Sequence, residues 1–144
     1  MAAGFEESDE QLSDLLTNAK TIAVVGAKDQ QSEDAFRVPL YMQRAGYRVM
    51  PVNPKLSNAL GETCHSMLTE ITNAVDIVNL FRASEHIPGH VDEILALDPR
   101  PMAVWMQLGI HNGEAAKRLR EAGIGVIQDR CIMVDHRRLF GESA

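Results

Sequence analysis

Basic side chains follow three apolar stretches of the sequence, spaced about one strand and one helix apart. Lys28 follows the first stretch, Lys55 the second and Arg82 the third. Ammonium and guanidinium groups make charge-assisted hydrogen bonds to phosphates, and they attract anions into clefts. The pattern therefore predicts a site for an anionic ligand, and Lys55 is the strongest candidate for a phosphate contact.

A strand-to-glycine turn introduces the first of these basic residues. Residues 22–25 are apolar, and Gly26 at their end lets the backbone approach a phosphate-bearing ligand closely. After the second apolar stretch, dinucleotide enzymes usually carry a carboxylate for a free ribose hydroxyl, whereas this chain carries Asn53, Pro54 and Lys55. An amide donor and a positive charge suit a phosphorylated ribose, which both coenzyme A (CoA) and NADP contain. Residues 26–31 lack the second and third glycines of Gly-x-Gly-x-x-Gly, which weakens the NAD(P) interpretation.

The elements that must position these residues alternate along the chain. Apolar runs predict five strands, at residues 22–25, 47–52, 75–81, 102–106 and 124–127. Amphipathic patterns predict helices at residues 6–20, 35–45, 85–97 and 114–122, with a short helix at 66–70. Strands separated by helices form parallel sheets, so we predict an α/β fold, a Rossmann-like three-layer sandwich with a mostly parallel five-stranded sheet. No repeat or linker divides the sequence, and one domain over residues 1–144 is expected.

Pro39 restricts where the second helix can begin. A proline inside a helix removes a hydrogen bond and crowds the preceding turn. We therefore expect a loop from Ala27 to about Arg37, with the helix starting near Val38.

Ligands of an open parallel sheet bind beyond the carboxyl ends of the strands. Four groups of residues follow strands here and are expected at one crevice: residues 26–31, 53–55, 81–82 and 107–109. Gln30 and Gln107 supply neutral hydrogen bonds, while Phe81 and Leu108 are suited to flank an adenine or a pantetheine arm. Trp105 lies within a strand and is interpreted as a core residue.

The overall composition restricts the class of partner. Of 144 residues, 45% are hydrophobic and 24% charged, and the formal net charge is -6. A protein that coats nucleic acid or an anionic membrane needs a basic face, so we expect a small-molecule ligand and neither of those partners. The N-terminus lacks a signal-peptide pattern and no run of about 18 apolar residues occurs, so a soluble, cytoplasmic protein is expected. A protein partner or a homo-oligomer stays open.

Cysteines and histidines show no metal-binding or catalytic pattern. Cys64 and Cys131 lack paired spacing and are predicted to be reduced thiols. An alternative, a Cys131 nucleophile with His136 as its base, would require the two side chains to meet. His86 and His90 lie four residues apart on a predicted helix, but no third ligand accompanies them, so we interpret them as surface residues. No catalytic residue and no metal site are assigned.

The order of short motifs resembles that of the small stand-alone CoA-binding proteins, which are similar to the N-terminal CoA-binding domain of the succinyl-CoA synthetase alpha subunit. The resemblance covers about residues 12–141, and the motifs are IAVVGA at 22–27, FRVP at 36–39, AGYRV at 45–49, PVNPK at 51–55, WMQLG at 105–109 and DRC at 129–131. It implies a Rossmann-like fold that holds CoA or an acyl-CoA.

The resemblance also implies a set of ligand-binding residues. It implies that Lys55 lies near the ADP moiety, and it implies further contacts from the loop of Gly26, Ala27, Lys28, Asp29 and Gln30 and from Met106, Gln107 and Leu108. Two features differ from the ligase: residues 28–31 replace a small glycine- and serine-rich loop, and the phosphorylated histidine belongs to a following domain that this chain is too short to contain. We therefore expect CoA binding without catalysis.

Two other classes of function remain as alternatives at this stage. The same strand, glycine and crevice would serve an NAD(P)-linked oxidoreductase or redox sensor. An accessory module that binds another protein is the third possibility. The sequence leaves open whether free CoA or a particular acyl-CoA is the ligand.

Overall fold

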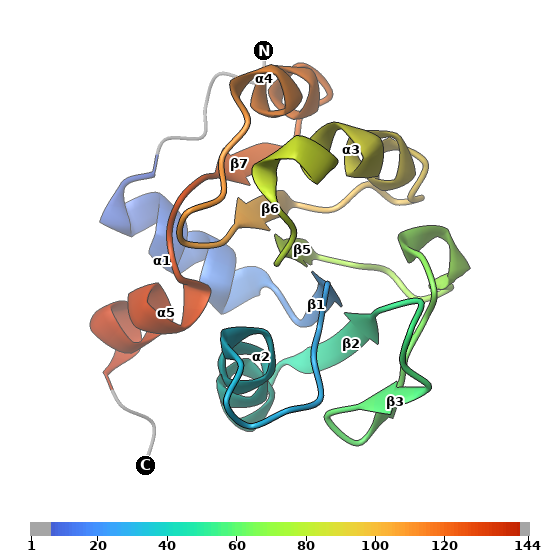
Figure 1. Cartoon of the computed structure of the whole chain (residues 1–144). Coiled ribbons are helices and arrows are strands. Elements are labelled where there is room, and N and C mark those ends of the chain that lie inside the picture. The colour runs from blue at the N-terminus through green and yellow to red at the C-terminus, as the bar shows by residue number, and fades with distance from the viewer. Residues whose placement is uncertain (1–6, 142–144) are drawn as a thin grey trace.

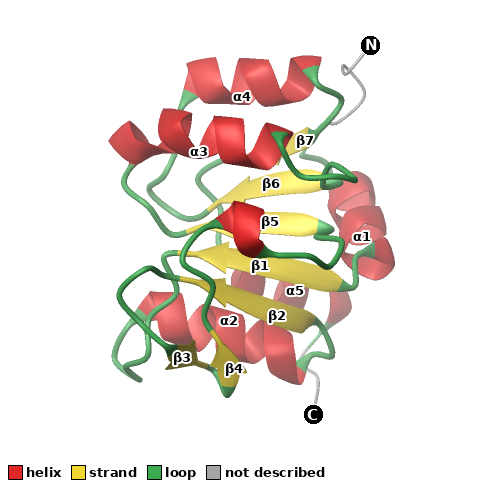
Figure 2. Ribbon diagram, turned by 90° about the vertical axis from the view of Figure 1, so that its right-hand side faces the viewer, coloured by secondary structure: helices red, strands yellow, loops and turns green. Residues whose placement is uncertain are grey.

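The computed structural model describes residues 7–141 (Figures 1 and 2). Its main feature is a parallel sheet with helices on both faces. The helices are α1 (Asp9–Asn18), α2 (Asp34–Arg44), α3 (Ile87–Leu95), α4 (Gly113–Glu121) and α5 (Ile132–Phe140), with short 3-10 helices η2 (Leu68–Glu70) and η3 (Ser84–His86). The strands are β1 (Thr21–Val25), β2 (Arg48–Val52), β3 (Asn58–Ala59), β4 (Glu62–Thr63), β5 (Ile77–Leu80), β6 (Ala103–Met106) and β7 (Gly125–Ile127).

The order of the strands creates a place where a ligand can bind. The order is β2-β1-β5-β6-β7, and every neighbouring pair is parallel. From β1 the chain first moves outward to β2 and then crosses back to β5 on the other side, so β1 and β5 flank a switch point. In open α/β sheets the crevice at such a point binds ligands at the carboxyl ends of the strands. The predicted Rossmann-like α/β fold is confirmed, with a five-stranded sheet that is entirely parallel.

Both faces of the sheet are covered, which explains why its strands are mostly apolar, with Asn79 of β5 as a buried polar exception. The helices α3 and α4 pack on one face around Val78, Leu80 and Val104. The helices α1, α2 and α5 pack on the other face around Val24, Ile77 and Trp105 (Figure 2). Trp105 is fully buried, as predicted, and its indole Nε1 donates to the Arg130 carbonyl at 2.9 Å.

The second helix begins where its amphipathic pattern predicted and not near Val38, because the proline inside it is tolerated. α2 starts at Asp34, so the expected loop up to Arg37 is wrong over its last residues. Pro39 lacks the N–H that would bond to the Ala35 carbonyl. The backbone N–H of Lys28 donates to that carbonyl instead, at 3.2 Å. The bond ties the loop after β1 to α2.

Two elements were not predicted, the β3–β4 hairpin and α5. Asp135 of α5 is buried and accepts from Arg130 Nε at 2.7 Å and from Arg138 Nη2 at 3.1 Å. Burial raises the pKa of Asp135, but the hydrogen bonds from the two arginines outweigh burial and hold this pKa below its ordinary value. Arg138 also binds Asp9, so α5 is linked to the start of α1.

The other predicted elements lie within about three residues of their observed bounds, apart from Glu6, which falls outside the described residues. Ser8 caps α1 by accepting from Gln11 N at 3.2 Å, and Asn112 caps α4 by accepting from Ala115 N at 2.9 Å. Within residues 7–141, every helix is too short or too polar to cross a bilayer.

Candidate ligand-binding cleft

A cleft of about 330 Å³ lies at the carboxyl ends of β1, β2 and β5, at the switch point of the sheet. Its volume is near the low end of the range, roughly 300–1,000 Å³, that small-molecule sites occupy. The residues that line it are Val25, Gly26, Lys28, Val52, Asn53, Pro54, Lys55, Ser66, Met67, Phe81, Arg82, His90 and Glu93. The three groups of predicted site residues that follow β1, β2 and β5 therefore contribute to a single cleft.

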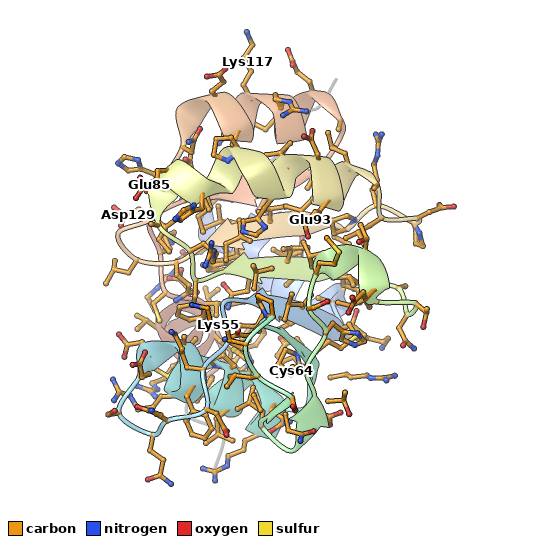
Figure 3. All side chains as sticks on the ribbon, turned by 45° about the vertical axis from the view of Figure 1, so that its right-hand side comes forward. Lys55, Cys64, Glu85, Glu93, Lys117 and Asp129 are labelled. Carbon is orange, nitrogen blue, oxygen red and sulfur yellow. The ribbon has the colours of Figure 1, made fainter. Side chains whose placement is uncertain are left out.

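Three basic side chains line this cleft. Lys28, Lys55 and Arg82 are exposed, and none of them forms a salt bridge within residues 7–141. Figure 3 shows Lys55 at the strand ends, well separated from Lys117 on α4. Unpaired cations that converge on a concave surface favour an anionic ligand.

Gly26 is required by the backbone that surrounds it. Its φ is +86°, a conformation that favours glycine, and its N–H donates to the Val52 carbonyl at 2.9 Å. A Cβ here would overlap the carbonyl oxygen of Phe81 and lie 3.2 Å from the carbonyl carbon. The glycine thus lets the ends of β1 and β5 approach each other at the floor of the cleft.

The Asn53 side chain makes its hydrogen bonds to other parts of the protein. Its Nδ2 donates to the Ala27 carbonyl at 2.8 Å, and its Oδ1 accepts from Lys55 N at 2.8 Å. The first bond links the loop after β1 to the loop after β2, and the second closes a turn that carries Lys55. Asn53 therefore shapes the cleft and orients its neighbour.

Only part of the loop after β1 lines the cleft. Lys28 lines the cleft through its side chain, since its N–H is bonded to α2. Ala27 is fully buried in the core. Asp29 lies in a separate shallow groove beside α2 with Arg37 and Arg44, so its charge lies outside the cleft. Gln30 is exposed and does not line the cleft.

The residues after β6 also lie outside the cleft. Met106 is fully buried between the sheet and the layer of α3 and α4. Gln107 is buried, and its Oε1 accepts from Ile132 N at 3.1 Å, which satisfies the first N–H of α5. Leu108 is 71% exposed in the following turn. The structure thus gives Gln107 a capping role within the fold.

Sequence reasoning missed six lining residues: Val25 and Val52 at the ends of their strands, and Ser66, Met67, His90 and Glu93. Our interpretation of His90 as a solvated surface residue is wrong, because it is half-buried and its Nδ1 lies 3.1 Å from Glu93 Oε2. The spacing of three residues on one helix was a usable signal, because it places two side chains on one helix face. The Ser66 hydroxyl donates to the Glu70 carboxylate, so its proton is already used within the protein.

The cysteines show no catalytic pairing in the described part of the chain. Both are free; Cys131 precedes α5 without a side-chain hydrogen bond to it, while His136 Nδ1 pairs with the Tyr41 hydroxyl at 2.9 Å. Burial lowers the pKa of His136. Burial, with a smaller effect of Asp29, raises the pKa of the Cys64 thiol, which keeps it protonated. No group of three or more His, Cys, Asp or Glu in residues 7–141 is placed to hold a metal ion.

Comparison with known proteins assigns a family to this geometry. Residues 20–137 match the protein family described as the CoA binding domain. The chain is 43% identical over 129 residues to the uncharacterized protein YneT of Bacillus subtilis, covering 90% of this chain and 94% of that protein.

Two solved structures extend the likeness to the whole fold. A Thermus thermophilus protein described as cell-free ID.343 has 44% sequence identity and a TM-score of 0.88, covering 92% of this chain and 99% of the other. A hypothetical protein from Pyrococcus horikoshii has 35% identity and a TM-score of 0.89, covering 96% of this chain and 94% of the other.

Proposed function

Because this chain belongs to the CoA-binding domain family, we propose that it binds coenzyme A, or an acyl-CoA, in the cleft at the ends of β1, β2 and β5. The three unpaired cations at the switch point are the observation that carries the proposal. CoA is a polyanion with a pyrophosphate and a ribose 3'-phosphate, so it complements such a site.

The three cations divide between two parts of the ligand. Lys55 binds the 3'-phosphate, because it follows β2, where Rossmann-like sites meet the adenosine ribose. Lys28 and Arg82, which follow β1 and β5, bind the pyrophosphate through their side chains. The backbone N–H groups of Gly26 and Lys28 are already bonded within the protein, so these two amides do not contribute.

The apolar lining and the small volume of the cleft determine which part of CoA it contacts. Val25, Val52, Met67 and Phe81 offer faces on which an adenine can pack. About 330 Å³ accommodates only the nucleotide end, so the pantetheine arm and any acyl group extend outside the cleft. The proposal assigns no chemistry to the chain, and the ligand is held without being transformed.

Calorimetric titration with CoA, dephospho-CoA and NADPH tests this proposal. One charge-assisted contact is worth roughly 1.5–3 kcal/mol, so CoA should bind about tenfold to hundredfold more tightly than dephospho-CoA. Lys55→Ala should abolish that preference, while Lys117→Ala, an exposed lysine on α4, should keep it. No binding of CoA would refute the proposal, and tighter binding of NADPH would favour an NAD(P)-linked protein.

A further inference from the structure

The cleft is lined by side chains of opposite charge that come from different elements. Lys28, Lys55 and Arg82 come from the loops after the strands, whereas His90 and Glu93 come from α3. Both α3 side chains are largely withdrawn from water, at 17% and 22% exposure, and Figure 3 shows Glu93 beneath α3. The α3 end of the cleft therefore carries a carboxylate where the strand end carries cations.

Hydrogen bonds to Glu93 determine the tautomer of the neutral His90 ring. Glu93 Oε1 accepts from Leu68 N at 3.1 Å, and Glu93 Oε2 lies 3.1 Å from His90 Nδ1. A carboxylate only accepts hydrogen bonds, so Nδ1 carries the proton. In the neutral imidazole Nε2 is then left with a lone pair, which makes it an acceptor without a partner in the described residues.

The same polarity orients a nucleotide in the cleft. Glu93 repels phosphates, and the three cations attract them to the other end. The uncharged base is therefore the part of the ligand that belongs beside α3. Among the edges of adenine, the exocyclic amino group is a hydrogen-bond donor, which matches an acceptor such as His90 Nε2.

We infer that His90 is a base-reading residue, which accepts a hydrogen bond from the adenine amino group and is held in the required tautomer by Glu93. This inference rests on the proposed function, because it concerns the same cleft. Glu93 acts through His90 as a positioning residue, and its bond to Leu68 N holds the carboxylate in place. Selectivity for adenine over a base with a carbonyl at that position follows.

Titration with CoA and with its deaminated analogue, in which hypoxanthine replaces adenine, tests this inference. The wild-type protein should bind CoA about fivefold to tenfold more tightly, the effect of one neutral hydrogen bond. His90→Phe should bind the two ligands equally, whereas His86→Phe, on the exposed η3, should keep the preference. Equal wild-type affinities would overturn the inference while leaving CoA binding intact, and absence of CoA binding would instead refute the proposed function.

Glu93→Gln gives a readout that a merely structural role would not produce. The amide oxygen can still accept from Leu68 N, but the amide nitrogen would donate to His90 Nδ1 and move the ring proton to Nε2. The variant should therefore prefer the hypoxanthine analogue, whose carbonyl accepts from Nε2–H. Unfolding midpoints show which variants are folded, and His90→Phe decides the question if Glu93→Gln is not. A folded Glu93→Gln variant that keeps the wild-type preference for CoA would contradict the role of Glu93.

Discussion

Replacing Asn53 should weaken the cleft from within the protein. Its side chain makes two hydrogen bonds of 2.8 Å, to the Ala27 carbonyl and from Lys55 N. A typical hydrogen bond adds about 1 kcal/mol, so Asn53→Ala should lower the free energy of unfolding by about 2 kcal/mol. CoA affinity should fall as well, because the turn that carries Lys55 loses its side-chain bond to the loop after β1, and only the backbone bond from Gly26 N to the Val52 carbonyl still joins them.

Chemical denaturation and calorimetry together measure these effects. Asn73→Ala, which truncates an exposed asparagine in a loop, is the matched control and should change neither quantity. Asn53→Asp keeps the acceptor for Lys55 N but loses the donor and adds a negative charge, so it should bind CoA more weakly than Asn53→Ala does. Wild-type stability together with wild-type affinity in Asn53→Ala would refute the proposed coupling of the two loops.

Two further predictions concern the backbone and acid stability. Gly26→Ala should cost about 3 kcal/mol, from a left-handed backbone and an overlap with a carbonyl, whereas Gly46→Ala, also at positive φ but with no atom within 4 Å of its Cβ, should cost only about 1–2 kcal/mol. Denaturation midpoints would compare them, and equal costs would contradict the proposed close approach. Folding lowers the pKa values of His136 and Asp135, so the unfolded chain binds more protons and acid destabilises the fold. The contribution of these two groups should be fully present above pH 6.5, decline below it as unfolded His136 protonates, and decline further below pH 3.8 through Asp135. A midpoint unchanged between pH 8 and pH 5 would contradict the role of His136.

The sheet and its switch point were predictable from the sequence, because buried parallel strands leave a strong periodic signal. Apolar runs separated by helical patterns determined five strands, and the carboxyl-end rule then brought residues after β1, β2 and β5 together. The predicted start of α2 near Val38 was wrong because of Pro39. Helix propensity does not reveal that Lys28 N would donate to the Ala35 carbonyl, which Pro39 leaves without its helical partner. The loss of one helical bond is compensated by a tertiary bond.

The inner details of the site were not predictable from local patterns. Asn53 looked like a ligand donor, but both ends of its amide are used by backbone groups, one of them 26 residues away in the chain. Gln107 follows a strand, yet it turns inward to cap α5, an element whose amphipathic pattern the sequence reading missed. His90 lines the cleft from α3, which is linked to η2 by the bond from Leu68 N to Glu93, a tertiary contact that no local pattern encodes.

The location of the ligand is the central claim, and backbone amide chemical shifts measured by NMR during a CoA titration test it most directly. We expect saturable shifts at Gly26, Lys55 and Arg82, with little change in the groove beside α2 at Arg37 and Arg44. Shifts concentrated at Arg37 and Arg44, with the three cleft residues unchanged, would contradict the account.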